Sequence, residues 1–173
     1  AETLSENADC RQAIRKNLWK HAVLECSLNV DEYEAGPFAT YKDYSERISL
    51  MPSHRILAVT RGESLKILKV RLQADHEAHI ERLSRQLITG PSPYTSLLKA
   101  AATDSYKRLI FPQLEREIRN ELFERGEKQA ITIFSENLRS LLMQPPFTQQ
   151  TILGLDPGYR TGCKAAVIDP TGN

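Results

Sequence analysis

The sequence has few cysteines, no long apolar run and almost no net charge. Its cysteines, Cys10, Cys26 and Cys163, are far apart and form no CxxC or Cys/His cluster. This argues against a disulfide framework and against a zinc site, and it indicates a reduced, cytoplasmic setting. No segment approaches the roughly 18 apolar residues that a membrane helix needs, so we expect no membrane association.

Charged residues make up 26% of the chain but nearly cancel, with 23 Lys and Arg against 22 Asp and Glu. The chain as a whole therefore lacks the electrostatic footprint of a nucleic-acid-binding protein, and any basic surface must be local. The first residue is not methionine, and the last residues, 170–173, read as a turn. We therefore expect the chain to be part of a longer protein.

Hydrophobic periodicity predicts a mainly helical chain. Helices are expected over residues 7–20, 51–61, 75–88 and 94–110. Ser5 or Asn7 can cap the first of these helices, and Asp75 can cap the third. Residues 22–28 fit either an extension of the first helix or a short extended piece. Residues 65–72 alternate like a half-buried strand, although a short helix is possible, and residues 29–49 are predicted to be irregular.

The longest predicted element is a helix over residues 113–143, separated from the preceding helix by Pro112. Gly126 costs about 1 kcal/mol relative to Ala inside a helix, so we expect a close helix contact, a mild bend or a break there. The apolar stripe of the helix is predicted to comprise Leu114, Ile118, Leu122, Ala130, Ile133 or Phe134, Leu138, Leu141 and Leu142. Ion pairs four residues apart are expected for Glu115 with Arg119 and for Glu121 with Arg125.

Some side chains in the helical part suit either a binding or a structural role. Arg11, Arg15 and Lys16 can face phosphates or form a solvated helix face, and we favour the solvated face. His76 and His79, three residues apart, are a conceivable metal pair, but without a third ligand in view we favour a structural role. The aromatic residues of segment 33–44 can stack bases or anchor the segment to a core, and we favour anchoring.

The end of the chain reads as a β-hairpin. An apolar, β-branched run at residues 151–155 and a second apolar run at residues 163–168 flank a connection rich in Gly, Pro and Asp. Asp156 is expected at the end of the first strand, beside a tight turn. Its carboxylate can close that turn, or it can serve as a metal-binding or phosphate-facing acid. Cys163 is expected to be a small core residue of the second strand.

Several segments resemble the Tex family of bacterial transcription accessory proteins, in the same order as in that family. They are YKDYSE, MPSHRILAVTRGE, DSYKRLIFPQLEREIRNELFERGEKQAI, ENLRSLLMQPP and ILGLDPGYRTGCKAAVID, which together cover most of residues 41–169. The motif ILGLDPGYRTG resembles the start of the YqgF-type, RNase H-like domain of these proteins. It is also similar to the first strand of Holliday-junction resolvases.

The resemblance implies a modular protein with a helical N-terminal half, an RNase H-like domain, helix-hairpin-helix modules and an RNA-binding OB-fold domain. It implies nucleic-acid binding through the parent protein and partners in the transcription machinery. Residues 1–146 would belong to the central helical region. Residues 147–173 would be the first strands of a truncated, RNase H-like α/β domain.

The resemblance also suggests roles for residues of the hairpin. In RNase H-like nucleases, the acid that matches Asp156 joins two or three others to hold two divalent ions. One carboxylate cannot do this, so we expect no enzyme activity and no cofactor in this chain alone, with Mg²⁺ required only if the parent is a nuclease. Arg160 and Lys164 can contact a phosphate backbone or remain ordinary exposed charges.

Three functions therefore stay open. The first is a non-enzymatic scaffold that positions nucleic-acid-binding modules, which we favour. The second is part of a metal-dependent nuclease or resolvase that uses Asp156. The third is self-association, because a truncated hairpin has free edges that invite pairing with another chain.

Overall fold

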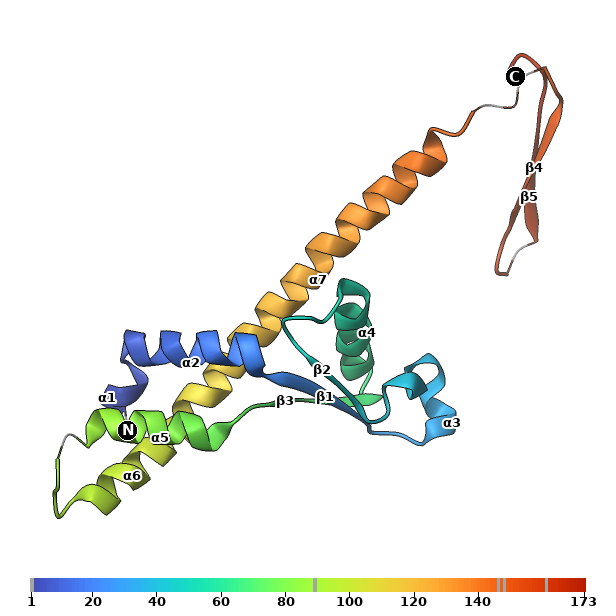
Figure 1. Cartoon of the computed structure of the whole chain (residues 1–173). Coiled ribbons are helices and arrows are strands. Elements are labelled where there is room, and N and C mark those ends of the chain that lie inside the picture. Colours follow the sequence, from blue (N-terminus) through green and yellow to red (C-terminus); the bar gives the residue numbers. More distant parts are fainter. Residues whose placement is uncertain (1, 89, 146, 148, 161) are drawn as a thin grey trace. The chain divides into compact units, whose positions relative to one another are not determined.

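The structure is a computed structural model that describes residues 2–88, 90–145, 147, 149–160 and 162–173. It divides into two compact units, Ala1–Thr132 and Ile133–Asn173, which we describe separately. As predicted, the chain is mainly helical, contains one long helix and ends in a β-hairpin (Figure 1). No helix in the described ranges combines the length and the apolar character needed to cross a membrane.

The first unit combines helices with a small sheet. Its elements are α1 (Glu2–Ser5), α2 (Ala8–His21), β1 (Val23–Leu28), α3 (Glu32–Ala35), η1 (Gly36–Tyr41), β2 (Tyr44–Arg47), α4 (Ser53–Ser64), β3 (Leu68–Gln73), α5 (His76–Leu87), α6 (Thr95–Asp104), the π-helical η2 (Ser105–Ile110) and α7 (Phe111–Leu142) up to Thr132. Two predicted caps are confirmed. The side chain of Asn7 accepts a hydrogen bond from the backbone N–H of Cys10, and Asp75 accepts one from Ala78, each at 3.0 Å.

The sheet is antiparallel with the strand order β2-β1-β3. Residues 22–28, left open by the sequence, supply the central strand β1, and the strand predicted within 65–72 is β3. In β3, Leu68, Val70 and Leu72 are buried while the residues between them are exposed. This alternation places one face of the sheet in the core and the other toward solvent.

The segment 29–49 was predicted to be irregular, and this prediction is wrong for most of it. It forms α3, η1 and the strand β2, which pairs with β1 through Tyr44 opposite Cys26 and Arg47 opposite Val23. The strand is only 4 residues long and mixes charged with aromatic side chains. Its pairing with β1 defines it as a strand, and local periodicity carries too little signal to predict it.

Helix α4 extends beyond the stop predicted at residues 61–63. Gly62 lies inside the helix and is buried. A Cβ atom at Gly62 would lie 2.6 Å from Cδ1 of Leu68 and 3.0 Å from Cδ1 of Phe38. Glycine is therefore present because α4 approaches β3 and η1 closely, and it does not end the helix.

Pro112 does not separate two helices, contrary to the prediction. Segment α6, the π-helical η2 and α7 follow one another without a break. The backbone N–H of Phe111 donates to the carbonyl oxygen of Tyr106, five residues earlier. Proline in a regular helix clashes with the carbonyl group four residues before it. The wider turn of η2 ends two residues before Pro112 and includes Arg108, the residue four positions before the proline, so the helical path continues without a break.

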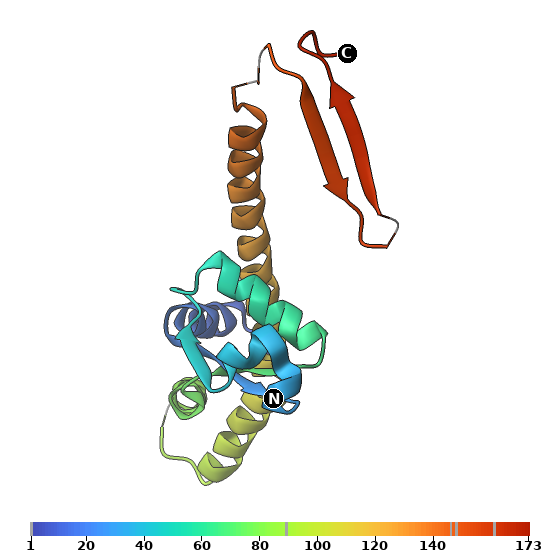
Figure 2. The same ribbon diagram turned by 90° about the vertical axis from the view of Figure 1, so that its right-hand side faces the viewer.

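Helix α7 is continuous through Gly126, and the close helix contact is the correct one of the predicted alternatives. A Cβ atom at Gly126 would lie 3.0 Å from Cγ2 and 3.3 Å from Cβ of Ile56 in α4. Figure 2 shows α4 crossing α7. The predicted stripe is buried at Leu114, Ile118 and Leu122 only. Its later members are exposed or partly exposed: Ala130, Ile133, Phe134, Leu138, Leu141 and Leu142.

The ion pairs predicted within α7 are wrong, because its charged residues pair with other elements. Arg119 pairs with Glu63 of α4, and Glu121 pairs with Arg15 of α2. Arg125 donates to two backbone carbonyl groups, those of Ile48 at 3.0 Å and Met51 at 2.8 Å. These contacts connect α7 to α2, to α4 and to the segment after β2.

The second unit contains the end of α7 and the hairpin of β4 (Ile152–Pro157) and β5 (Cys163–Ile168). The strands are antiparallel, with Ile152 opposite Ile168 and Asp156 opposite Lys164. The predicted hairpin is confirmed, and its first strand extends to Pro157. Figure 1 shows the two strands side by side.

Candidate functional site

The hairpin brings two of the three predicted site residues together. Asp156 of β4 lies directly opposite Lys164 of β5, so the two exposed side chains share one face of the hairpin. Arg160 lies in the connecting loop and is also exposed. The loop is closed by a 2.9 Å hydrogen bond from the N–H of Gly158 to the carbonyl oxygen of Gly162. The backbone of Asp156 is therefore part of the strand ladder, ahead of the turn.

Asp169 is at the opposite end of the hairpin from Asp156. It is five residues beyond Lys164, or about 17 Å along an extended strand. Its Oδ1 accepts hydrogen bonds from the N–H of Asn173 at 2.9 Å and of Thr171 at 2.9 Å, so it closes the terminal turn. The hydrogen bond from the Asn173 N–H is the largest cause that lowers the pKa of Asp169. Asp169 therefore serves the turn and is no partner for Asp156.

The described residues contain no group of three or more His, Cys, Asp or Glu side chains placed to hold a metal ion. The hairpin alone thus offers a single carboxylate at the predicted metal position. A two-metal site requires several carboxylates around the ions. Any such site would need acids supplied from outside the described residues.

Both faces of the hairpin are apolar apart from the pair Asp156 and Lys164. One face carries Leu153, Leu155 and Pro157 of β4, opposite Val167, Ala165 and Cys163 of β5. The other face carries Ile152 and Gly154, opposite Ile168 and Ala166. Strands that are apolar on both faces are typical of a sheet covered on both sides. Cys163, predicted to be a core residue, is exposed in this structure.

His76 and His79 do not form the conceivable metal pair, because both rings bind Tyr106. The hydroxyl group of the fully buried Tyr106 lies 3.0 Å from Nδ1 of His76 and 2.9 Å from Nδ1 of His79. Nε2 of His79 lies 2.9 Å from Oδ1 of Asn17. Since this amide oxygen can only accept, His79 Nε2 carries a proton, Tyr106 donates to His79 Nδ1, and His76 donates to Tyr106.

This network has a defined electrostatic state. Burial lowers the pKa of His79, and burial also raises the pKa of Tyr106. Both effects favour the neutral forms of His79 and Tyr106. The hydrogen bonds of the network connect α2, α5 and η2, which indicates a structural role.

Two cations of α2 that were considered for phosphate binding form ion pairs with α7. Arg11 Nη2 lies 3.1 Å from Glu117 Oε1, and Arg15 pairs with Glu121. Arg11 and Arg15 remain partly exposed in these ion pairs, and Lys16 is exposed, so this side of α2 is a polar surface, part of which pairs with α7. The spacing of four residues between Arg11 and Arg15 matches the spacing of their partners, so one helix face binds the other.

The aromatic residues of segment 33–44 mostly anchor it, as favoured. Phe38, Tyr41 and Tyr44 pack against the core cluster, and the rings of Tyr41 and Tyr44 meet edge to face at 5.2 Å. Tyr33 is fully exposed. These three rings are partly buried against the core, which favours anchoring over the stacking of bases.

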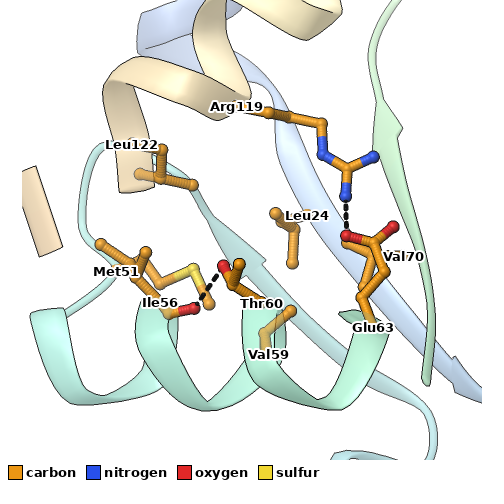
Figure 3. Close-up of a pocket in the computed structure, with 9 residues that line it drawn as sticks. All are labelled: Leu24, Met51, Ile56, Val59, Thr60, Glu63, Val70, Arg119 and Leu122. Carbon is orange, nitrogen blue, oxygen red and sulfur yellow. Dashed lines mark hydrogen bonds and ion pairs between the residues drawn. The ribbon is translucent and has the colours of Figure 1, made fainter. Parts of the chain in front are cut away.

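The polar contacts between α4 and α7 could not be predicted from local patterns in the sequence. Figure 3 shows Arg119 directed at Glu63 above a small cavity lined by Leu24, Met51 and Leu122 among others. Burial is the main cause that raises the pKa of the nearby Cys26 thiol to about 11, which keeps it protonated and unreactive. These residues lie far apart in the sequence, so no local spacing predicts them.

Two family models match the chain. The model described as Tex central region-like matches residues 1–134, and the model described as Tex protein YqgF-like domain matches residues 150–173. The second match covers the hairpin with Asp156, Arg160 and Lys164.

Similar proteins occur in bacteria and in animals. An uncharacterized protein, YdcI of Bacillus subtilis, is 44% identical over 178 residues, which cover 99% of this chain and 24% of the relative. The transcriptional accessory protein Tex of Neisseria gonorrhoeae is 35% identical, with 99% of this chain and 24% of the relative covered. The human S1 RNA-binding domain-containing protein 1 is 35% identical over 99% of this chain and 19% of its own length. The chain thus spans about a quarter or less of the length of these relatives.

Proposed function

The chain belongs to the Tex family of transcription accessory proteins, and we propose that it is a helical scaffold that positions nucleic-acid-binding modules of a longer Tex protein. We place it in the cytoplasm, with nucleic acid and the transcription machinery as partners of the longer protein. The central helical region is proposed to comprise residues 1–146. Residues 147–173 are proposed to begin the RNase H-like domain.

The use of charge in the first unit carries the scaffold proposal. Arg11, Arg15, Arg119 and Arg125 bind carboxylates or carbonyl groups of neighbouring elements. In the described part of the chain, every buried side-chain nitrogen or oxygen has a hydrogen-bond partner. A catalytic or ligand site commonly keeps polar groups free for its ligand. The first unit uses these polar groups for hydrogen bonds and ion pairs within itself, which supports a structural role.

The scaffold role is tested by the stiffness of α7 in a full-length Tex protein that contains this chain. Residues 133–139 are exposed, so they can be replaced without disturbing the core. A Gly/Ser sequence of the same length makes this part flexible, whereas an Ala/Glu/Lys sequence keeps it helical. We expect the flexible replacement to weaken nucleic-acid binding at least about tenfold, because the modules lose their fixed spacing. Equal affinities for both replacements would reject the scaffold role.

Arg160 and Lys164 are the proposed contacts of the hairpin with a phosphate backbone. Both are exposed cations at one end of the hairpin. Replacing both by Ala in the full-length protein should reduce the slope of log affinity against log salt by about 2, since each phosphate contact contributes about 0.9. An unchanged slope would assign them to the solvated surface.

Asp156 is proposed to be a vestigial position without a catalytic role. The opposed Lys164 places a positive charge near the carboxylate, and a cation there competes with a divalent metal ion. In the full-length protein with Mg²⁺ or Mn²⁺, Asp156→Asn is expected to leave any nuclease activity unchanged. Loss of a metal-dependent activity in this variant would instead support the alternative function, a nuclease or resolvase.

A further inference from the structure

The largely apolar groove between η1 and α4 is an unassigned feature of the first unit. Figure 1 shows η1 beside one end of α4. One wall of this groove consists of Pro37, Phe38, Thr40 and Tyr41 of η1. We call it the α4–η1 groove.

The other wall is the outward side of α4. It is formed by Leu57, Ala58, Arg61 and the C-cap residue Leu65, whereas Ile56 on the other side of the helix is buried in the core. Residues 57, 61 and 65 are four apart, so they follow one another along a single helix face. Ala58 and Leu65 leave apolar surface open on this face, whereas Leu57 also packs toward α7, with its Cδ2 3.6 Å from the position of a Cβ at Gly126.

The groove exposes apolar surface in a concave setting. Leu65 is 54% exposed, and Leu57, Ala58, Phe38 and Tyr41 are partly exposed. A hollow lined by aliphatic and aromatic groups is the usual site for an apolar anchor side chain of a partner. The groove therefore offers apolar surface to a side chain of a partner.

The charge of the groove indicates the chemistry of the partner that it can bind. Of the eight described residues that line it, one, Arg61, is charged, and none is acidic. An exposed guanidinium beside an apolar hollow complements a carboxylate next to an apolar side chain, because guanidinium and carboxylate form paired hydrogen bonds. A nucleic-acid strand fits less well, because it requires several cations and free ring faces. Here there is one cation, and the ring of Phe38 packs against Gly62.

We propose that the α4–η1 groove binds a short peptide segment of a partner protein that carries an apolar anchor residue beside an acidic residue. The anchor lies between the walls formed by Phe38 and Leu57, and its neighbouring carboxylate binds Arg61. This interaction goes beyond the scaffold role, since it concerns a protein partner of the first unit.

The test is selection of a random octapeptide library on the purified 173-residue chain. We expect the wild-type chain to enrich peptides with an apolar and an adjacent acidic residue. The variant Arg61→Glu should instead enrich apolar residues beside Lys or Arg, because its charge is reversed. For one enriched peptide, Arg61→Ala should weaken binding at least about tenfold, as expected for the loss of a charged hydrogen bond.

Two blocking variants and one matched control complete the experiment. Ala58→Arg fills the groove from α4, and Thr40→Arg fills it from η1; both should abolish enrichment while emission from Trp19 shows a folded unit. Leu97→Arg adds the same charge at an exposed apolar residue of α6, outside the groove, and should keep the wild-type consensus. Absence of a consensus, or a consensus unaffected by either blocking variant, would overturn the proposal. So would a 12-nucleotide RNA that binds the wild-type chain but neither blocking variant.

Discussion

Replacing Gly126 by Ala provides a direct test of the contact between α4 and α7. Two effects of opposite sign compete in this variant. Alanine is favoured over glycine by about 1 kcal/mol inside a helix. The added methyl group would lie 3.0 Å from Cγ2 of Ile56, well inside the optimal carbon separation of about 3.5–4.0 Å.

The steric effect should win, because Ile56 cannot move out of the way. It is only 2% exposed, and its branched side chain is stiff at χ1. Its Cβ, 3.3 Å from the added methyl group, moves only with the backbone of α4. Such overpacking costs about 1–3 kcal/mol, so Gly126→Ala should lower the free energy of unfolding by a net of about 1 kcal/mol.

The assay is urea unfolding of the 173-residue chain, monitored by emission from Trp19, the single tryptophan, in α2. In an Ile56→Ala background the closest atom, Cγ2, is absent and only Cβ at 3.3 Å remains, so Gly126→Ala should lose most of its destabilising effect, with a coupling of about 1 kcal/mol between the two sites. Asn120→Ala, at an exposed site of α7, is the control for helix propensity and should stabilise by a few tenths of a kcal/mol. If Gly126→Ala alone stabilises the chain by about 1 kcal/mol, the close contact is refuted.

Three other properties follow from named contacts. Arg125→Ala should lower the free energy of unfolding by about 2–3 kcal/mol, measured by circular dichroism, because two carbonyl groups lose a charged donor; a change below about 0.5 kcal/mol would contradict this. The pKa of His79 is lowered in the folded state, so below the unfolded value of about 6.5 the unfolded state binds more protons, and stability should fall as the pH decreases. His79→Gln should show a smaller fall in stability in paired urea titrations at pH 7.5 and 5.5, and equal falls would exclude His79 as the cause. The exposed apolar hairpin should make the chain self-associate, with a mass that rises with concentration in light scattering; Leu155→Lys should reduce this, and a wild-type chain that stays monomeric would argue against pairing through the hairpin.

Local signals in the sequence were sufficient to predict most helices. Asn7 and Asp75 form their caps with residues three positions later, so the information lies within one turn. The hairpin was predicted for the same reason, because its two apolar runs and its connecting turn are adjacent in the sequence. Asp156 was correctly placed near the end of the first strand, but its neighbour Lys164 emerges only from the register.

Contacts between distant segments could not be predicted in this way. Arg119 has Glu115 four residues before it, yet it binds Glu63, because the packing of α4 on α7 brings that carboxylate closer. Strand β2 depends on β1, and the π-helical turn before Pro112 is a response of the backbone to proline. In each case the decisive partner is absent from the local sequence pattern.

Helix α7 accounts for why the first unit holds together as one body. Its face at Ile118 and Leu122 is buried in the core, while neighbouring positions bind α2 through Glu117 and α4 through Arg119. One helix therefore supplies apolar burial and polar pairing to several elements at once. Beyond Thr132 its residues are exposed and contribute nothing to that core. The rest of α7 belongs to the second unit and leads to the hairpin, as the proposed scaffold role requires.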